Sequence, residues 1–335
     1  MRVALCGLGE IGQHHLAAIR SCPDLELAAV CDLDEERARR DAGSAAVHTS
    51  VGRMLAEEEI DAVDVCLPHS LHQGVAEEAL RAGCDVLLEK PLALDLKGCD
   101  AILAAAVAAG RRVAVSHHQL FYGPHRRLRE LIAGGQIGEI QAIYARLWIG
   151  GRYGGWRTDP EAVGGGLLMD AGVHRIYCLR YLGGPVRAVT ATMDRPRDEE
   201  SFSVTLEFAS GALGVAQGSY HCPEGTFDDR LDVVGSEGLA AVAGCKAFFE
   251  GDLRGVAPLR TRLGGAWVDD PVGGSWAESV RDSVQQSLLA LERGEEPPVG
   301  ASAGRETVAL IEAAYRSAEC RERVLVAELA TTEAL

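Results

Sequence analysis

Arg2-Val3-Ala4-Leu5-Cys6-Gly7-Leu8-Gly9-Glu10-Ile11-Gly12 opens the chain, and its pattern decides the fold of the N-terminal domain. An apolar run leads directly into G-x-G-x-x-G, which predicts a strand, a glycine turn and the start of a helix. The first glycine permits the tight turn, the second lets the backbone approach a pyrophosphate, and the third lets helix pack on strand. Amide groups at the start of such a helix point toward an anion. The stretch therefore predicts a dinucleotide site.

Length and composition set the class of protein. The chain has 335 residues, which suits two domains of roughly 150 residues each. With 47% hydrophobic and 24% charged residues it is typical of globular proteins. We expect a cytoplasmic protein without a membrane segment, because no apolar run approaches the ~20 residues of a membrane span and the N-terminus does not resemble a signal peptide.

Charge and cysteine content narrow the range of partners. The formal net charge of −16 argues against binding to nucleic acid or anionic membranes. An acidic surface attracts a cationic substrate such as an amino sugar, or it only keeps the protein dispersed. The ten cysteines are scattered without a C-x-x-C pair, which favours reduced, buried thiols.

Asp32 follows the glycine turn at the distance expected for a cofactor contact. It lies twenty positions after Gly12, at the end of a predicted strand over residues 25–31. A carboxylate there accepts hydrogen bonds from the ribose hydroxyls of NAD. Asp34 follows, and the next arginine is Arg37, so the pattern favours NAD over NADP. The alternative is that Asp32 is a turn residue or caps a helix predicted over residues 35–41.

Helices and strands alternate through the first third of the chain. Strands are predicted over residues 2–6, 25–31, 62–67, 85–89 and 112–116, and helices over 13–20, 35–41, 54–59, 74–81 and 96–109. This alternation predicts an α/β Rossmann domain, a doubly wound parallel sheet that binds its ligand at the carboxyl ends of the strands. Two strand ends carry polar side chains, Leu67-Pro68-His69 with His72 after one strand and Glu89-Lys90 after the next.

From about residue 140 the pattern becomes that of an α+β domain. Strands are predicted over residues 140–149, 186–193, 201–208, 212–220, 231–234, 238–243 and 246–250, helices over 167–182, 276–293 and 305–321, and a loop over 251–274. Successive strands joined by short turns predict an open, mostly antiparallel sheet. We therefore expect a dinucleotide-binding domain over residues 1–118 and a substrate and oligomerisation domain over 119–335. The final helix of the second domain packs either within that domain or back on the first one.

Three motifs together resemble a known family. They are the N-terminal G-x-G-x-x-G, the E-K-P triplet at residues 89–91, and W-R-T-D-P at 156–160 leading to G-G-G-x-x-x-D-x-G-x-H at 164–174. The chain resembles the glucose–fructose oxidoreductase / inositol dehydrogenase (Gfo/Idh/MocA) family over nearly its whole length. The resemblance implies a Rossmann domain, a second domain whose sheet builds homodimers or homotetramers, and a cis peptide bond between Lys90 and Pro91.

The resemblance also implies which residues form the site. Lys90, Asp170 and His174 would surround the substrate carbon that exchanges hydride with the nicotinamide. The cofactor-binding set is Gly7, Gly9, Glu10, Ile11, Gly12, Asp32, Leu33, Leu67, Pro68, His69, His72, Glu89 and Lys90. For His69 the alternative is a solvated loop residue.

Removal of hydride from an alcohol carbon also requires a base near the hydroxyl proton. Asp170 and His174 are four residues apart on a predicted helix, hence on one face. Our hypothesis assigns His174 as general base, Asp170 as its partner and substrate anchor, and Lys90 as polariser and proton relay; whether His174 or Lys90 is the principal proton acceptor stays open. The alternatives are a solvated lysine and a surface Asp–His pair. Gly172 serves either close approach of a ligand or helix packing.

The substrate wall is predicted from ring faces, which suit sugar C–H groups, and from side chains that bind hydroxyls. The predicted substrate residues are Gln119, Phe121, Trp156, Arg157, Asp170, His174 and Tyr177. Two positions depart from the family pattern. Tyr177 replaces the final aspartate of D-x-G-x-H-x-x-D, and residues 118–121 read H-Q-L-F where N-x-R-F is usual. A preference for sugar or inositol therefore does not transfer.

The sequence predicts an NAD-dependent dehydrogenase that oxidises a secondary hydroxyl of a sugar, amino sugar, aminoglycoside intermediate or cyclic polyol. No metal is expected, because no three-ligand spacing joins Asp170 and His174 to another histidine such as His117, His118 or His221. The alternatives are an NAD-dependent glycosidase that oxidises the ring transiently, and a dinucleotide-binding regulator without catalysis, which would need none of the three predicted catalytic residues.

Overall fold

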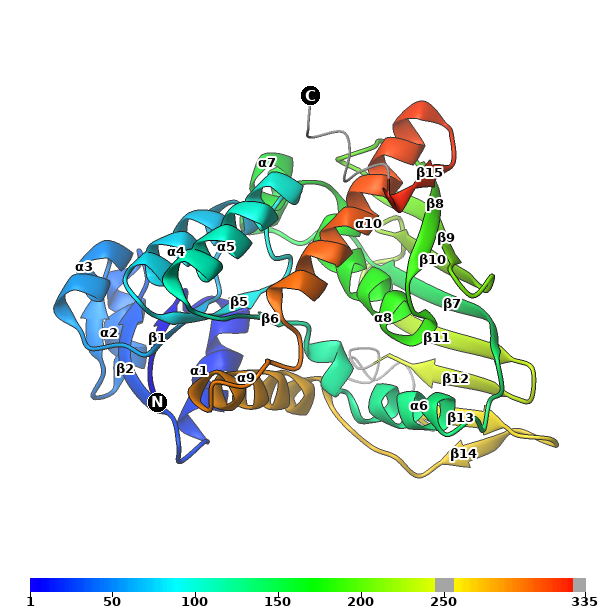
Figure 1. Ribbon diagram of the computed structural model, residues 1–335, viewed down its shortest axis with the longest axis horizontal. Helices are drawn as coiled ribbons and strands as arrows, with labels where there is room; N and C mark the ends of the chain where they lie inside the picture. The colour runs from blue at the N-terminus through cyan, green and yellow to red at the C-terminus, as the bar shows by residue number, and fades with distance from the viewer. Residues whose placement is uncertain (245–255, 328–335) are drawn as a thin grey trace. The chain divides into compact units, whose positions relative to one another are not determined.

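The structure is a computed structural model that describes residues 1–244 and 256–327, and Figure 1 labels its elements. The chain forms two compact units, one of Met1–His118 with Val280–Val308 and one of Gln119–Ser279 with the chain from Ala309. The predicted second domain ran without interruption to the C-terminus. In the structure, however, residues 280–308 pack with the first unit, where Gln285 Nε2 donates to Ala18 O at 2.8 Å.

The first unit is built on a six-stranded sheet in the order β3-β2-β1-β4-β5-β6. Its strands are β1 (Arg2–Cys6), β2 (Glu26–Cys31), β3 (Ala46–His48), β4 (Ala62–Val65), β5 (Asp85–Glu89) and β6 (Val113–Ser116). All pair in parallel, which confirms the doubly wound sheet. The strand order reverses between β1 and β4, and ligands bind at the carboxyl ends of strands at such a point.

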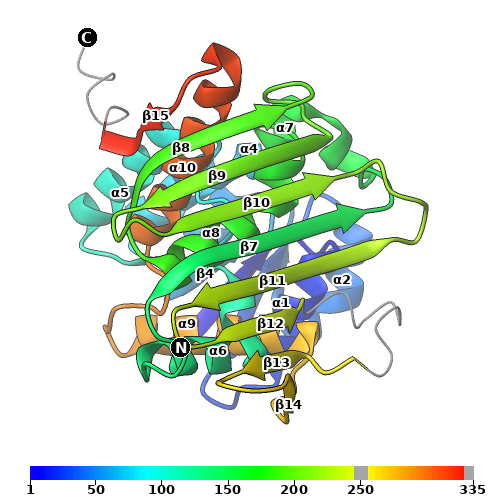
Figure 2. The ribbon, with the colours of Figure 1, turned by 90° about the vertical axis from the view of Figure 1, so that its right-hand side faces the viewer.

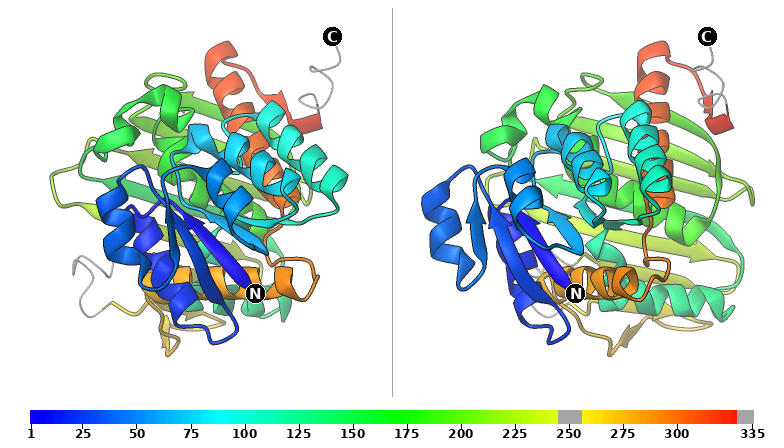
Figure 3. Two further views of the ribbon diagram at one scale, coloured as in Figure 1. Left: turned by 90° about the vertical axis from the view of Figure 1, so that its left-hand side faces the viewer. Right: turned by 60° about the vertical axis from the view of Figure 1, so that its left-hand side comes forward.

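Helices connect these strands (Figure 3). They are α1 (Glu10–Arg20), α2 (Glu35–Ala42), α3 (Val51–Glu57), α4 (His69–Arg81) and α5 (Leu96–Ala109), to which α9 (Trp276–Glu292) is added from the distant part of the chain. The central strands β4 and β5 are buried along their whole length. Parallel strands covered on both faces read as continuous apolar runs, and this explains why the sequence pattern located them.

The second unit is built on a nine-stranded sheet in the order β14-β13-β12-β11-β7-β10-β9-β8-β15. Its strands are β7 (Ile140–Ile149), β8 (Val186–Met193), β9 (Ser201–Phe208), β10 (Leu213–Ser219), β11 (Phe227–Gly235), β12 (Leu239–Ala243), β13 (Leu259–Arg262), β14 (Val268–Asp270) and β15 (Val324–Leu325). Only β7 and β10 pair in parallel among the described strands of this sheet, so the predicted mostly antiparallel sheet is confirmed.

Helices of the second unit lie over one face of this sheet. They are α6 (Gly123–Ala133), α7 (Pro160–Val163), α8 (Val173–Gly183) and the part of α10 (Ala301–Cys320) from Ala309 on, with 3-10 turns η1 (His118–Phe121) and η2 (Gly155–Thr158) and a π-helical turn η3 (Leu168–Gly172). No helix from the described part of this unit crosses the face that Figure 2 turns to the viewer. Strands β9 and β10 alternate buried residues with less buried ones along their length, as an antiparallel sheet covered on one face requires.

Several expectations of secondary structure differ from the structure. Strand β3 and helix α6 were not predicted, since three residues give too short a pattern and α6 begins with Gly123-Pro124, which reads as a turn. Residues 251–274 were predicted as a loop, but the part from 256 onward contains β13 and β14. The predicted strand over 246–250 and the beginning of that loop lie outside the described residues.

Within residues 1–244 and 256–327, no helix combines the length and the apolar character that crossing a membrane requires.

Candidate active site

The glycine turn between β1 and α1 has the geometry of a phosphate-binding turn. Gly7 has a positive φ of 90°, and a Cβ there would lie 2.2 Å from the Cys66 carbonyl oxygen after β4. A Cβ on Gly12 would lie 2.1 Å from the Gly7 carbonyl oxygen. Gly9 differs, because no described atom lies within 4 Å of the Cβ position. The protein itself therefore needs Gly7 and Gly12, whereas the space over Gly9 suits a pyrophosphate.

Asp32 is fixed against this turn by backbone hydrogen bonds. Its Oδ2 accepts the Leu8 N–H at 2.8 Å and its Oδ1 accepts the Asp34 N–H at 2.9 Å. Arg37 reaches both carboxylates, with Nη1 3.5 Å from Asp32 Oδ2 and Nη2 3.2 Å from Asp34 Oδ2. The cap of α2 is Asp34, whose side chain accepts the Arg37 N–H. Asp32 is therefore not the helix cap, while its bond to the Asp34 N–H is that of a turn residue.

The polar strand ends after β4 and β5 are joined by His72. Its Nδ1 lies 2.8 Å from Pro91 O and its Nε2 lies 3.0 Å from Leu67 O. Burial lowers the pKa of His72, which favours the neutral ring. The Lys90–Pro91 peptide bond is cis, as the resemblance implied. His69 is only 3% exposed, so the solvated alternative for it is wrong.

Behind Lys90 lies a buried cluster of charged side chains that no sequence pattern predicted. His15 Nδ1 lies 2.9 Å from Asp64 Oδ2, and His15 Nε2 lies 3.3 Å from Glu89 Oε1. The second oxygen of Glu89 accepts the Lys90 N–H at 3.2 Å. His15 and Asp64 are fully buried and Glu89 is 6% exposed. The cluster therefore ties α1, β4 and β5 to the backbone of Lys90.

Electrostatics within this cluster favour an imidazolium between two carboxylates. Burial lowers the pKa of His15, but Asp64 and Cys66 together outweigh it, and the pKa lies well above the ordinary value. Burial raises the pKa of Glu89, but the hydrogen bond and charge of His15 bring it down to about 2. Cys66 joins the group, with its Sγ 3.9 Å from Asp64 Oδ1.

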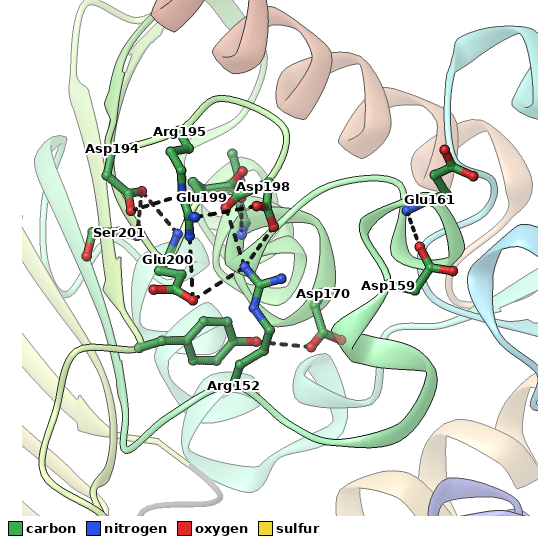
Figure 4. Close-up of polar contacts among 12 residues, drawn as sticks. Arg152, Asp159, Glu161, Asp170, Asp194, Arg195, Asp198, Glu199, Glu200 and Ser201 are labelled. Carbon is green, nitrogen blue, oxygen red and sulfur yellow. Dashed lines mark hydrogen bonds and ion pairs between the residues drawn. The ribbon is translucent and has the colours of Figure 1, made fainter.

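In the second unit, Asp170 lies on the π-helical turn η3, immediately before α8. Arg157 Nε donates to Asp170 Oδ1 at 3.2 Å, and Tyr220 Oη donates to Asp170 Oδ2 at 3.1 Å. Figure 4 labels Asp170 and marks the second of these contacts with a dashed line. Asp170 is 4% exposed and His174 is 9% exposed. Because η3 is a π turn, the interval between them is not the regular α-helix expected, and such turns are frequent at functional sites.

Aromatic rings surround the Arg157 guanidinium. Its Cζ lies 4.5 Å from the centroid of the Trp156 ring and 5.8 Å from that of Tyr153. The Tyr153 ring in turn meets the Tyr220 ring edge-on at 6.4 Å. The structure thus brings Trp156, Arg157 and Asp170 together into one polar and aromatic wall.

Three other predicted substrate residues are engaged in packing within the same unit. Gln119 Oε1 accepts from Cys178 Sγ at 3.9 Å. The Phe121 ring lies 5.4 Å below the Arg126 guanidinium. Tyr177 stacks on Tyr181 with centroids 6.3 Å apart. Gly172 also has a packing reason, because a Cβ there would lie 3.0 Å from the Phe202 ring.

Two groups of side chains among the described residues have the spacing to hold a metal ion. One is His15, Asp64 and Cys66, and the other is Asp194, Glu200 and His221. In the first, the imidazole already bonds to Asp64 and Glu89. In the second, Arg152 lies 3.7 Å and Arg195 3.6 Å from Glu200 Oε1, and their positive charges oppose a cation.

Sequence reasoning missed Tyr220, Tyr153 and Asp64. Tyr220 ends a predicted strand and Asp64 lies within an apolar strand run. Neither Tyr220 nor Asp64 belongs to a sequence motif. Only the fold brings Tyr220 to Asp170, 50 positions away, and Asp64 to His15, 49 positions away.

Two family profiles match the chain. The profile described as "Oxidoreductase family, NAD-binding Rossmann fold" matches residues 1–117, and the one described as "GFO/IDH/MocA C-terminal domain" matches residues 125–241. The chain belongs to the GFO/IDH/MocA family. The resemblance seen in the motifs is confirmed, and this GFO/IDH/MocA protein is an NAD(P)-dependent oxidoreductase with an NAD-binding Rossmann domain.

Two relatives are named as dehydrogenases of a polyol and of a glucoside. The chain is 28% identical over 349 residues to inositol 2-dehydrogenase of Rhizobium meliloti (strain 1021), covering 98% of this chain and 99% of the relative. It is 35% identical over 199 residues to D-glucoside 3-dehydrogenase of Escherichia coli (strain K12), covering 57% of each. The crystal structure of GenD2 from gentamicin A biosynthesis in complex with NAD matches with 26% identity and a TM-score of 0.83, covering 97% of this chain and 96% of GenD2.

The buried cluster predicts a specific pH dependence of stability. Since the folded pKa of Glu89 is depressed to about 2, its contribution is present above its unfolded value of 4.5 and is lost as pH falls toward 2. The urea midpoint of the wild type should therefore fall across this interval, and that of Glu89→Gln should fall less.

Removal of the imidazole tests the same cluster. His15→Asn leaves two buried carboxylates facing each other and should lower the free energy of unfolding by about 3–5 kcal/mol at pH 7. The neighbouring His14→Asn, which alters a partly exposed side chain, is the control. Equal losses in the two variants would show that the cluster carries no charge-pair stabilisation.

Proposed function

We propose that the protein is an NAD-dependent dehydrogenase that oxidises a secondary hydroxyl of a sugar, amino sugar, aminoglycoside intermediate or cyclic polyol to a ketone, or catalyses the reverse reaction. The observation that carries the proposal is the Asp170 carboxylate of the D-x-G-x-H motif, buried between Arg157 and Tyr220 beside the Trp156 ring. A carboxylate, a guanidinium and a ring face are the groups that bind a polyhydroxylated ring. The activities of the inositol and glucoside dehydrogenases support this substrate class.

Each residue has a role in this proposal. When bound, the nicotinamide accepts the hydride. His174 accepts the hydroxyl proton as general base, Asp170 anchors the substrate, and Lys90 polarises the reacting oxygen and relays the proton. The hydrogen bonds from Arg157 and Tyr220 hold the Asp170 side chain in one orientation, a role that only the folded arrangement suggests.

The proposal includes a positively charged substrate. GenD2, named for gentamicin A biosynthesis, supports an amino sugar or aminoglycoside intermediate. The formal net charge of −16 favours the approach of such a cation.

The free thiols of the described cysteines support a reducing compartment, so we place the protein in the cytoplasm.

Cofactor preference follows from the fixed carboxylate of Asp32. Its oxygens lie beside the glycine turn, where ribose hydroxyls would donate to them. Arg37 is held by Asp32 and Asp34, so its charge is neutralised before any 2′-phosphate arrives. We therefore assign NAD over NADP.

We propose that a homodimer or homotetramer forms through the face of the nine-stranded sheet that Figure 2 turns to the viewer, which no described helix of its unit crosses. On β7 the rings of Tyr144 and Trp148 are 48% and 41% exposed, and the Arg146 guanidinium lies 4.1 Å from the latter ring. Leu213 on the neighbouring β10 is 45% exposed. Exposed large apolar side chains gathered on one face of a sheet mark interaction surfaces.

The base role is tested with His174→Ala. Formation of NADH at 340 nm is followed over inositols, hexoses, amino sugars and aminoglycoside precursors. The variant should lose about 10²–10⁴ in kcat while its affinity for NAD is unchanged. His221→Ala, an exposed histidine, is the control. Full activity of His174→Ala would remove it from the role, and glycoside cleavage without net NADH would favour the glycosidase alternative.

The cofactor assignment is tested with Asp32→Asn, which keeps an acceptor for the Leu8 N–H. Loss of the charge should weaken NAD binding about tenfold and, by releasing Arg37, strengthen NADP binding. Titration of both dinucleotides by calorimetry measures the two changes. The control is Glu36→Gln, which alters an exposed side chain on the same helix as Arg37. Tight, NADP-selective binding by the wild type would contradict the assignment.

The oligomer proposal is tested with the double variant Tyr144→Asp and Trp148→Asp. Two carboxylates on an apolar interface should convert an oligomer into a monomer, measured by size-exclusion chromatography with light scattering. Val107→Asp, at an 82% exposed position on α5, should leave the mass unchanged. A monomeric wild type would refute this part of the proposal.

A further inference from the structure

Glu199 is a fully buried acid that the proposed mechanism does not use. It lies between β8 and β9, and its side chain points to the start of the turn that carries Asp170 (Figure 4). Glu199 Oε1 accepts the Leu168 N–H at 2.7 Å and the Tyr315 hydroxyl at 3.3 Å. Its backbone carbonyl accepts the Leu167 N–H at 2.9 Å. One residue thus satisfies two consecutive amide groups at the beginning of this turn.

The glycine run that precedes the turn leaves the space that this contact needs. A Cβ on Gly166 would lie 2.2 Å from the Glu199 carbonyl oxygen, and one on Gly165 would lie 2.1 Å from the Tyr315 hydroxyl oxygen. Neither clash is with a side chain that can rotate away, because one is with backbone and the other with a fully buried ring. Two glycines of the G-G-G run therefore make room for Glu199 and Tyr315.

The two oxygens of Glu199 differ in their surroundings. Oε2 is buried and has no hydrogen-bond partner within the described residues, while Oε1 accepts two donors. A neutral acid fits this arrangement, with the proton on Oε2 and the carbonyl oxygen as the double acceptor. A carboxylate would leave half of its charge without a donor. Accordingly, burial raises the pKa of Glu199 to about 7, against the hydrogen bonds that lower it.

Other ionisable groups around Glu199 are engaged with partners of their own. Tyr315 comes from α10, where the Arg197 guanidinium lies 5.0 Å from its ring and pairs with Glu312. Asp198 and Glu200 flank Glu199 and both lie within 4 Å of Arg152 and Arg195, while Asp170 on η3 bonds to Arg157 and Tyr220. Because these charges are already paired, Glu199 is the group whose own ionisation changes the hydrogen bonds at the start of the turn.

We propose that Glu199 is a positioning residue whose neutral form fixes the start of the Asp170-bearing turn, and whose ionisation loosens it. The ionised oxygen must gain water or a donor, which the closed arrangement does not supply. The turn then leaves the position in which Asp170 meets Arg157 and Tyr220. This inference rests on the proposed function for its effect on catalysis, but its effect on stability does not depend on any substrate.

The first test measures the melting temperature between pH 5 and pH 9. A folded pKa above the unfolded value of 4.5 gives stability that is present below pH 4.5 and lost as pH rises through about 7. The wild type should therefore lose melting temperature relative to Glu199→Gln up to about pH 7, with a constant difference above. Glu200→Gln, which alters the partly exposed neighbour in the chain, should keep the wild-type dependence. A difference between wild type and Glu199→Gln that does not vary with pH overturns the proposal.

The second test uses the substrate found by NADH formation. Between pH 6 and pH 8 the ratio of the wild-type kcat/KM to that of Glu199→Gln should fall about tenfold, as the protonated fraction falls. Glu199→Ala should lose activity at both pH values, and Glu199→Gln should restore it at both. A constant ratio overturns the positioning role, whereas an absence of any turnover overturns the proposed function and leaves the melting test decisive.

Tyr315→Phe provides a variant that keeps the acid. It removes one donor to Oε1, and this hydrogen bond lowers the pKa of Glu199. The inflection in melting temperature should therefore move to higher pH. An inflection that stays in place in Tyr315→Phe, or moves down, contradicts the proposal even if Glu199→Gln fails to fold.

Discussion

The close approach of Gly7 to the carbonyl group of Cys66 is the contact on which the first unit depends. It joins the end of β1 to the end of β4 at the point where the strand order reverses, with a separation that excludes any side chain. Gly12 then lets α1 begin directly against this turn. Because α1 is held so near the sheet, His15 on its second turn reaches Asp64 and Glu89. The same packing that opens space over Gly9 therefore builds the charged cluster behind Lys90.

Much of the fold was predictable from the sequence because its signals are local. The parallel strands are apolar runs, the glycine turn has a fixed spacing, and the antiparallel strands alternate. The short β3 and the Gly-Pro start of α6 were missed, since local pattern is weakest there. Strands β13 and β14 were predicted as loop because their exposed, charged residues give little alternation.

The candidate site was predictable only as far as its motifs extend. Lys90, Asp170 and His174 lie in recognisable spacings, and their catalytic roles stay predictions. The partners of these residues lie elsewhere in the chain: Tyr220 is 50 positions from Asp170, and Tyr315 is 116 positions from Glu199. Such pairs are created by strand order and helix packing, so no local pattern reports them. The G-G-G run was visible as a motif, but its purpose required the positions of Glu199 and Tyr315.

The return of residues 280–308 to the first unit has a consequence for how the chain folds. Met1 N bonds to Glu292 at 2.9 Å, Gln285 bonds to Ala18, and Arg305 Nη2 donates to Asp100 Oδ2 at 2.9 Å. Residues 119–279 of the second unit are thus inserted within the first unit, and the chain returns to the second unit from Ala309. During synthesis, residues 1–118 leave the ribosome long before the segment that completes their packing. The cofactor-binding unit therefore reaches its final form only after most of the second unit has been made.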